Sequence, residues 1–180
     1  MVRRSTTSTS MPSSSRSSAA SSALWTIAPY VITLTSSPLR FTSALPIGKA
    51  DVKRDGDDVS VITYGAMVHK ALEAAADLEE QGVSVEVVDL RTITPLDTET
   101  ILESVTKTSR ALVLYESNRF LGVGAEVSAV IAEEGFESLD APVMRLAPPD
   151  TPVPFSPPLE DAYIPQVDDI VDAVNRLSKW

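Results

Sequence analysis

From residue 58 to the C-terminus, the chain alternates between β-branched runs of strand length and stretches whose apolar residues recur at helical spacing. Runs of the first kind favour strands and those of the second favour amphipathic helices. The predicted strands cover residues 58–64, 83–88, 111–115 and 141–146. The predicted helices start near Val68, Thr98 and Val167 and end near Gln81, Lys107 and Leu177. A further helix follows the loop of residues 116–126 and ends near Glu134. Strands that alternate with helices imply right-handed crossovers and a mainly parallel sheet with helices on both faces.

A specific turn joins the second predicted strand to the helix after it. Pro95 prevents a helix from starting before it, and Asp97 can cap the helix that follows. The polar pair Asp89 and Arg91 comes directly after the strand. We therefore expect this pair just past the carboxyl end of a strand, where open α/β sheets place their working surfaces.

Two further segments complete the predicted fold. Residues 111–115 are wholly apolar, which predicts a strand buried in the centre of the sheet. Residues 148–165 contain seven prolines, which predicts an extended surface arm without regular structure. The predicted fold class is an α/β three-layer sandwich over residues 46–180, with a mainly parallel sheet of five strands or fewer.

A sharp change in composition divides the chain near residue 45. Residues 1–45 contain no Asp or Glu, four Arg and 20 Ser or Thr, whereas residues 46–180 contain all 25 acidic residues and 11 basic ones, a net charge of −14. A stretch of about 135 residues has the usual size of one domain. We expect one folded domain there, preceded by a segment that does not belong to it.

The acid-free leader has three readings. Its Arg and Ser content is typical of an organelle transit peptide, which would direct the protein to the mitochondrial matrix. The low complexity of Met1 to Ser22 is instead typical of a disordered tail. The abrupt loss of acids at one point indicates a shifted frame or a misplaced start upstream of about Leu45. We expect a disordered or mis-framed leader and a cytoplasmic protein.

The acidity of residues 46–180 limits the partners. Phosphates repel such a surface, so we expect neither nucleic acid nor an anionic membrane as a partner. A basic protein partner would be attracted, and a saline cytoplasm would explain the same acidity. The absence of Cys excludes disulfides and a thiolate nucleophile.

Familiar catalytic and cofactor motifs are missing. The turn at Gly65 has one glycine where a dinucleotide-binding fingerprint needs three. No phosphate-binding glycine loop and no G-x-S-x-G elbow occur. His69 is the only histidine, so the rival reading of a small stand-alone enzyme depends on His69 acting with Asp89.

Several segments resemble a known family in an ordered series. They are Leu45–Ala50, Glu86–Asp97, Gly122–Val127, Asp140–Leu146 and Asp150–Pro154 followed by Ile164–Pro165. Together they resemble the C-terminal domain of the beta subunit of a thiamine-diphosphate 2-oxoacid dehydrogenase, of the pyruvate or branched-chain type. The same domain type forms the C-terminal part of transketolases and deoxyxylulose phosphate synthases. The Asp-x-Pro-x-Pro segment and the Ile-Pro pair favour the dehydrogenases.

The resemblance implies an assembly domain rather than a catalytic one. Family beta subunits also carry an N-terminal domain that holds the cofactor, and the leader stands in its place here. We therefore assign no catalytic, cofactor-binding or metal residue, and expect this chain alone to be inactive. Thiamine diphosphate and magnesium belong to the parent complex. The implied partners are the alpha subunit, a second beta subunit and the dihydrolipoyl acyltransferase core. The candidate interface residues are Glu116, Gly122, Gly124 and Glu126.

Overall fold

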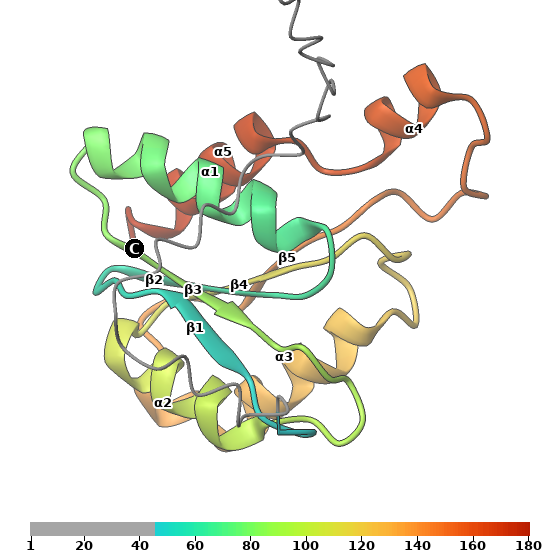
Figure 1. Ribbon diagram of the computed structural model, residues 1–180. Coiled ribbons are helices and arrows are strands. Elements are labelled where there is room, and N and C mark those ends of the chain that lie inside the picture. Colours follow the sequence, from blue (N-terminus) through green and yellow to red (C-terminus); the bar gives the residue numbers. More distant parts are fainter. Residues whose placement is uncertain (1–45) are drawn as a thin grey trace, which may run out of the picture. The chain divides into compact units, whose positions relative to one another are not determined.

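A five-stranded sheet forms the middle layer of the domain in the computed structural model, which describes residues 46–180. The strands are β1 (Asp51–Arg54), β2 (Val59–Thr63), β3 (Val85–Asp89), β4 (Ala111–Leu114) and β5 (Met144–Leu146). Their order across the sheet is β1-β3-β2-β4-β5 (Figure 1). Only β1 is antiparallel to its neighbour, so the sheet is mainly parallel. The expectations for the leader lie outside the described residues.

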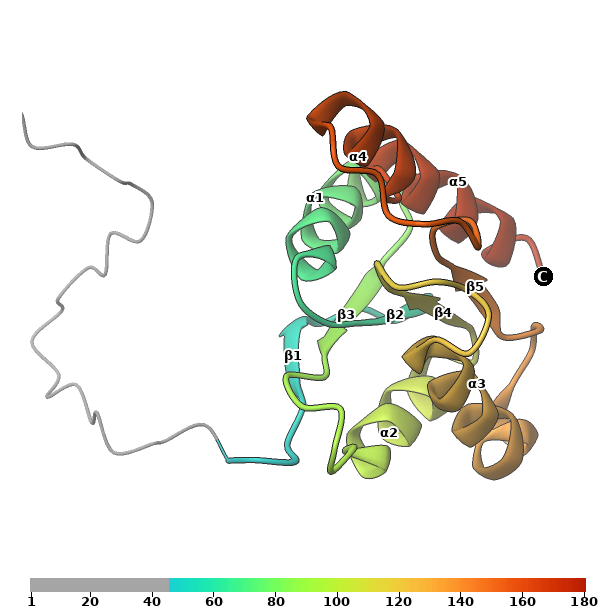
Figure 2. The same ribbon diagram turned by 90° about the vertical axis from the view of Figure 1, so that its right-hand side faces the viewer.

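Helices cover both faces of this sheet. They are α1 (Met67–Glu80), α2 (Thr98–Thr108), α3 (Val123–Glu134), α4 (Pro157–Tyr163) and α5 (Val167–Leu177), with a short 3-10 turn η1 at Phe136–Ser138. Figure 2 shows α1 and α5 on one face and α2 and α3 on the other. The predicted three-layer α/β sandwich is therefore confirmed.

Two apolar clusters hold the layers together, one on each face of the sheet. Alternate side chains of one strand pack in different clusters, because successive side chains of a strand point to opposite faces of the sheet. In β4, Leu112 and Leu114 pack with α1 and α5, whereas Ala111 and Val113 pack with α2 and α3. All four are at most 2% exposed, so the predicted burial of this strand is confirmed. The central strand is nevertheless β2, because β5 adds beyond β4.

The N-terminal edge strand β1 has no counterpart in the predicted strands. Its sequence, Asp-Val-Lys-Arg, has one apolar residue, and the strand is partly exposed. It pairs with β3 through Asp51 opposite Asp89 and Val52 opposite Val88. Gly56 then turns the chain toward β2 so close to β3 that a Cβ there would lie 2.2 Å from the carbonyl carbon of Val85.

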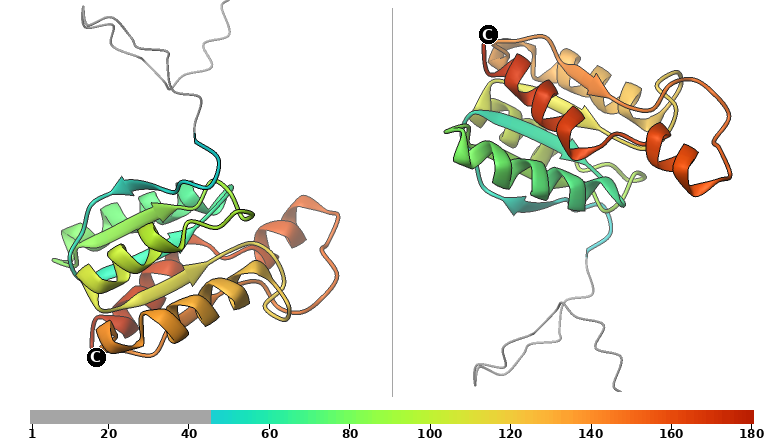
Figure 3. Two further views of the ribbon diagram at one scale, coloured as in Figure 1. Left: turned by 90° about the horizontal axis from the view of Figure 1, so that it is seen from below. Right: turned by 90° about the horizontal axis from the view of Figure 1, so that it is seen from above.

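The expectation that the proline-rich arm has no regular structure was wrong. Seven of its residues form α4, which begins with Pro157 and Pro158. Proline is tolerated in the first turn of a helix, because the amide groups there have no partner inside the helix. The arm is exposed, as expected, and Figure 3 shows it extending with α4 beyond the end of the sheet.

Candidate functional site

The loops that follow the four parallel strands lie at one edge of the sheet, the carboxyl edge. They comprise residues 64–66, 90–97, 115–122 and 147–156. Parallel strands bring such loops together, which is why ligands and partners of open α/β sheets meet this edge. Of the residues for which the sequence suggested a role, Arg91, Glu116 and Gly122 lie in these loops, and Asp89 lies just before one of them. Gly124 and Glu126 lie in α3, and His69 lies in α1.

Asp89 is the last residue of β3 rather than lying past it, and Arg91 lies just past the carboxyl end of the strand, as predicted; the charges of both are already paired. The Arg91 guanidinium contacts the carboxylate of Asp51 in β1, and the Arg91 amide donates to Asp89 Oδ1 over 3.1 Å. Lys53 Nζ lies 2.7 Å from Asp51 Oδ2 and 3.8 Å from Asp89 Oδ2. The hydrogen bond from Lys53 lowers the pKa of Asp51 below its ordinary value. This network fixes β1 to the sheet instead of presenting free reactive groups.

Gly122 and Gly124 allow the start of α3 to pack directly on the ring of Tyr115. A Cβ at Gly124 would lie 1.9 Å from Tyr115 Cε1, and one at Gly122 would lie 2.2 Å from the Asn118 carbonyl oxygen. Tyr115 is fully buried. The glycines therefore serve close backbone approach within the domain.

Glu116 and Glu126 are the exposed members of the predicted interface set. Glu116 follows Tyr115 at the carboxyl edge, and its Oε1 would lie 3.4 Å from a Cβ placed on Gly65. Glu126 lies in the first turn of α3, where a negative charge complements the helix dipole. The structure thus places both carboxylates in solvent on the segment that follows β4.

The loop after β4 is fastened to the proline-rich arm. The Tyr163 hydroxyl of α4 donates to Asn118 Oδ1 over 2.9 Å, and the Phe120 amide donates to Asp150 Oδ1 over 2.8 Å. These bonds join segments that lie 30 to 45 residues apart in the sequence. The arm and the loop therefore form one continuous surface.

That surface exposes large apolar side chains. Phe120 is 72% exposed, Leu121 85%, Val153 68% and Phe155 fully exposed; we call these four residues the carboxyl-edge surface. Large apolar side chains exposed on a protein surface are typical of sites that contact a partner. No role was predicted for Phe120 or Leu121 from the sequence. Two large apolar residues between polar loop residues were the signal that could have found them.

The alternative of a small enzyme that uses His69 with Asp89 finds no support in the contacts of His69. This residue is exposed on α1, and within residues 46–180 no ion pair or side-chain hydrogen bond joins it to Asp89 or any other group. Nor does this part of the chain gather three or more His, Asp or Glu side chains that could hold a metal ion. In the same part, no helix has the length and apolar character needed to cross a bilayer.

Comparison with known proteins gives consistent matches to one part of larger subunits. The acetoin:2,6-dichlorophenolindophenol oxidoreductase subunit beta of Cupriavidus necator is 48% identical over 136 residues, 76% of this chain and 40% of that protein. The pyruvate dehydrogenase E1 component subunit beta of Bacillus subtilis is 50% identical over 136 residues, 76% of this chain and 42% of that protein. The 2-oxoisovalerate dehydrogenase subunit beta of the same organism is 47% identical over 137 residues, with the same two coverages. This chain thus spans about two fifths of the length of these curated relatives.

A solved structure and a family match agree with the fold described above. The structure of a split gene transketolase, described as an inactive beta4 tetramer, superposes with a TM-score of 0.65 at 31% identity, covering 74% of this chain and 42% of that one. Residues 48–170 match the family described as "Transketolase, C-terminal domain". This match spans more than half of the sequence, so the chain belongs to the transketolase C-terminal domain family.

Proposed function

We propose that residues 46–180 are the C-terminal assembly domain of the beta subunit of a 2-oxoacid dehydrogenase. The observation that carries this proposal is the carboxyl-edge surface, whose four apolar side chains are 68% exposed or more. Covering them in a complex would remove apolar area from water, which is the main driving force of stable association. Relatives 47 to 50% identical are beta subunits of dehydrogenases for pyruvate and 2-oxoisovalerate, which supplies the class of complex.

In this proposal the chain contributes assembly, and other parts of the complex contribute the chemistry. The parent reaction is the oxidative decarboxylation of a 2-oxoacid with thiamine diphosphate and magnesium. The proposal assigns no catalytic step to residues 46–180. The purified chain, assayed with pyruvate or branched-chain 2-oxoacids and with cofactor and magnesium, should show no turnover. Turnover without an added subunit would overturn the proposal.

The proposed partners are an alpha subunit, a second beta subunit and the dihydrolipoyl acyltransferase core. The net charge of −14 on residues 46–180 supports a basic docking element on the last of these. Binding of a basic peripheral domain should weaken as salt rises from low to physiological concentration, because salt screens surface charges. An affinity that does not change with salt would contradict this assignment.

A chimeric subunit tests assembly directly. The 136-residue matching segment of the Bacillus subtilis pyruvate dehydrogenase beta subunit is replaced by the corresponding residues of this chain. We expect the chimera to copurify with the alpha subunit of that enzyme and to oxidise pyruvate. Serine at both Phe120 and Leu121 should prevent copurification. Phe136→Ser is the matched control, because Phe136 is equally exposed, at 71%, but lies in η1 outside the carboxyl-edge surface.

A transketolase is the second candidate, supported by the superposition on the split gene enzyme. A transketolase half-chain should complement this chain only if the second candidate is right. Ketol transfer after mixing with the alpha half of a split transketolase would favour it over the dehydrogenase, and copurification of the chimera with no such transfer would favour the dehydrogenase.

A further inference from the structure

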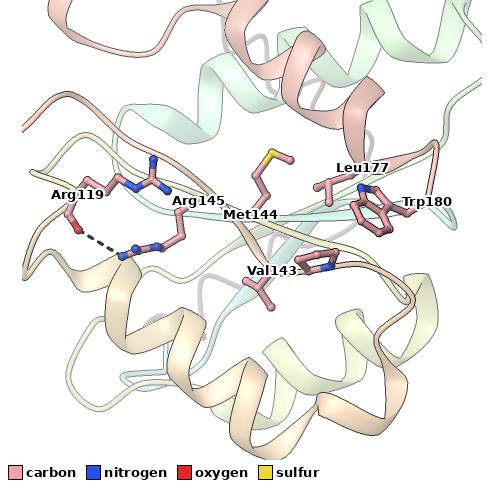
Figure 4. Close-up of a pocket in the computed structure, with 7 residues that line it drawn as sticks. Arg119, Val143, Met144, Arg145, Leu177 and Trp180 are labelled. Atoms are coloured by element: carbon pink, nitrogen blue, oxygen red, sulfur yellow. Dashed lines mark hydrogen bonds between the residues drawn. The ribbon is translucent and has the colours of Figure 1, made fainter.

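A pocket lies between β5 and the end of α5. Its volume is about 340 Å³, and it is lined by Arg119, Pro142, Val143, Met144, Arg145, Leu177 and Trp180. Figure 4 shows the two arginines at one end, Leu177 and Trp180 at the other, and Met144 and Val143 between them. The pocket therefore has a cationic end and an apolar end.

The two arginines differ from most other cations of the domain. Lys49, Lys53, Arg54, Arg91 and Lys107 each lie within ion-pair distance of a carboxylate. Arg119 and Arg145 form no such pair with any residue from 46 to 180, although this part of the chain carries 25 acidic residues. Arg145 Nη1 donates to the Arg119 carbonyl oxygen over 3.3 Å, which fixes the Arg145 side chain beside the Arg119 backbone.

Two neighbouring guanidinium groups that form no ion pair are suited to an external anion. Their planar donor arrays match carboxylate and phosphate oxygens, and each bond is strengthened by charge. An anion placed there would also relieve the repulsion between the two positive groups. Asp150 lines a neighbouring hollow with both arginines but forms no ion pair with either, and its Oδ1 accepts from the Phe120 amide.

The rest of the pocket suits an apolar or aromatic group. Leu177 is fully buried, Val143 and Met144 are half-buried, and the Trp180 ring is 69% exposed and available for stacking. A volume near the lower end of the usual range for ligand pockets fits a small molecule. A folded protein partner could not enter such a space.

We propose that this pocket binds a small organic anion, with its carboxylate or phosphate on Arg119 and Arg145 and its apolar body against Met144 and Trp180. Nothing in the assembly role requires such a site. Its test can therefore fail while the assembly role stands, and the reverse also holds.

Tryptophan fluorescence gives a direct readout in the full chain. The sequence has two tryptophans, Trp25 and Trp180, so Trp25→Phe leaves Trp180 as the single reporter. The probes are phenyl phosphate, phenylacetate and the uncharged 2-phenylethanol. We expect saturable changes in Trp180 emission with an anionic probe and at least about tenfold weaker binding of 2-phenylethanol, because each charge-assisted bond contributes strongly. The tighter of the two anions identifies the ligand as a phosphate or a carboxylate.

Substitutions assign the binding to the arginines. Arg119→Gln and Arg145→Gln should each weaken binding of the tighter anion about tenfold, the factor expected for one charge-assisted bond. Arg176→Gln is the matched control, because it removes the same charge from an exposed position of α5 outside this pocket. Arg119 is exposed in a loop, so Arg119→Gln keeps the test valid if Arg145→Gln fails to fold.

Four results would overturn the proposal. Three of them are equal binding of 2-phenylethanol and the anions, unchanged binding in both arginine variants, and no emission change with any probe. Binding of poly-glutamate but of neither small anion would also overturn it, because the ligand would then be an acidic polypeptide.

Discussion

Tyr115 is the residue on which the start of α3 depends. Its ring lies against Gly124 so closely that no side chain fits there. The same ring is fully buried, and its hydroxyl oxygen has no hydrogen-bond partner among the described residues. The packing of the ring and the state of its hydroxyl can be tested separately.

Gly124→Ala should destabilise the domain by about 1 to 3 kcal/mol, the usual cost of overpacking a core. Chemical denaturation of wild type and variant measures the difference. The added methyl collides with the Tyr115 ring, so Tyr115→Leu should relieve part of the cost when the two changes are combined. An equal cost in both backgrounds would show that the ring is not the obstacle.

Tyr115→Phe should leave the free energy of unfolding unchanged or raise it slightly. A buried hydroxyl without a partner costs free energy, and its removal leaves no other group unpaired. Tyr163→Phe is the comparison, because its hydroxyl donates to Asn118 over 2.9 Å. We expect the second variant to lose about 0.5 to 1.5 kcal/mol, the net value of a hydrogen bond. The reverse order of the two variants would contradict this assignment.

Single residues were predictable where the signal was local. The helix cap at Asp97 followed from cap chemistry alone. The pairing of Asp89 and Arg91 did not, because it depends on Asp51 and Lys53, some 40 residues earlier. A free working pair was expected where the structure has an internal network.

At the scale of the elements, the start of α2 is held by the side chain of Asp97. Asp97 is 4% exposed, and its carboxylate accepts from the Ala50 amide over 2.9 Å and from the Thr100 hydroxyl over 2.7 Å. Burial raises the pKa of this carboxyl, but these hydrogen bonds and the nearby Lys49 charge lower it more, so the net pKa lies below the ordinary value. One side chain thus caps a helix and fastens the segment that leads into β1.

Asp97→Ala should cost about 1 to 2 kcal/mol at neutral pH, the value of a strong helix cap. A lowered folded-state pKa means that the charged carboxylate contributes stability above its unfolded pKa and loses it as the pH falls through the folded pKa. The difference in the free energy of unfolding between wild type and Asp97→Ala should therefore become smaller below about pH 4. Denaturation curves from pH 7 to pH 3 measure it.

Glu99→Gln serves as the control for this series. Glu99 lies on the same helix and pairs with Lys49 at the exposed surface, where ion pairs contribute little. Its loss should change stability far less than Asp97→Ala does. If the loss of stability in Asp97→Ala stays constant with pH, the charge of Asp97 does not cause that loss.

Elements with a strong hydrophobic period were predictable, and weakly patterned ones were not. The strands β2, β3 and β4 and the helices α1, α2, α3 and α5 match the predicted segments closely, because burial imposes their periods. The edge strand β1 has too little apolar character to be recognised. The helix α4 was missed because the seven prolines of the arm were taken to exclude regular structure. Two of them stand at the start of α4, where proline is compatible with a helix.

At the scale of the whole chain, the boundary near residue 45 remains a prediction. Trypsin should remove the leader at Arg3, Arg4, Arg16 and Arg40 and leave a stable core whose first residue lies near Pro46. Mass spectrometry of a time course identifies the core. Persistent protection of Arg16 and Arg40 would show that the leader packs on the domain.

The order of strands, β1-β3-β2-β4-β5, also bears on how the domain folds. The ribosome releases β1 first, but its hydrogen-bonding partner β3 lies beyond β2 and the whole of α1. β1 must therefore wait, unpaired, until more than 30 residues have followed it, whereas β2, α1 and β3 can form one unit among themselves. We expect substitutions in β1 to accelerate unfolding while scarcely slowing refolding, because its contacts form after the transition state.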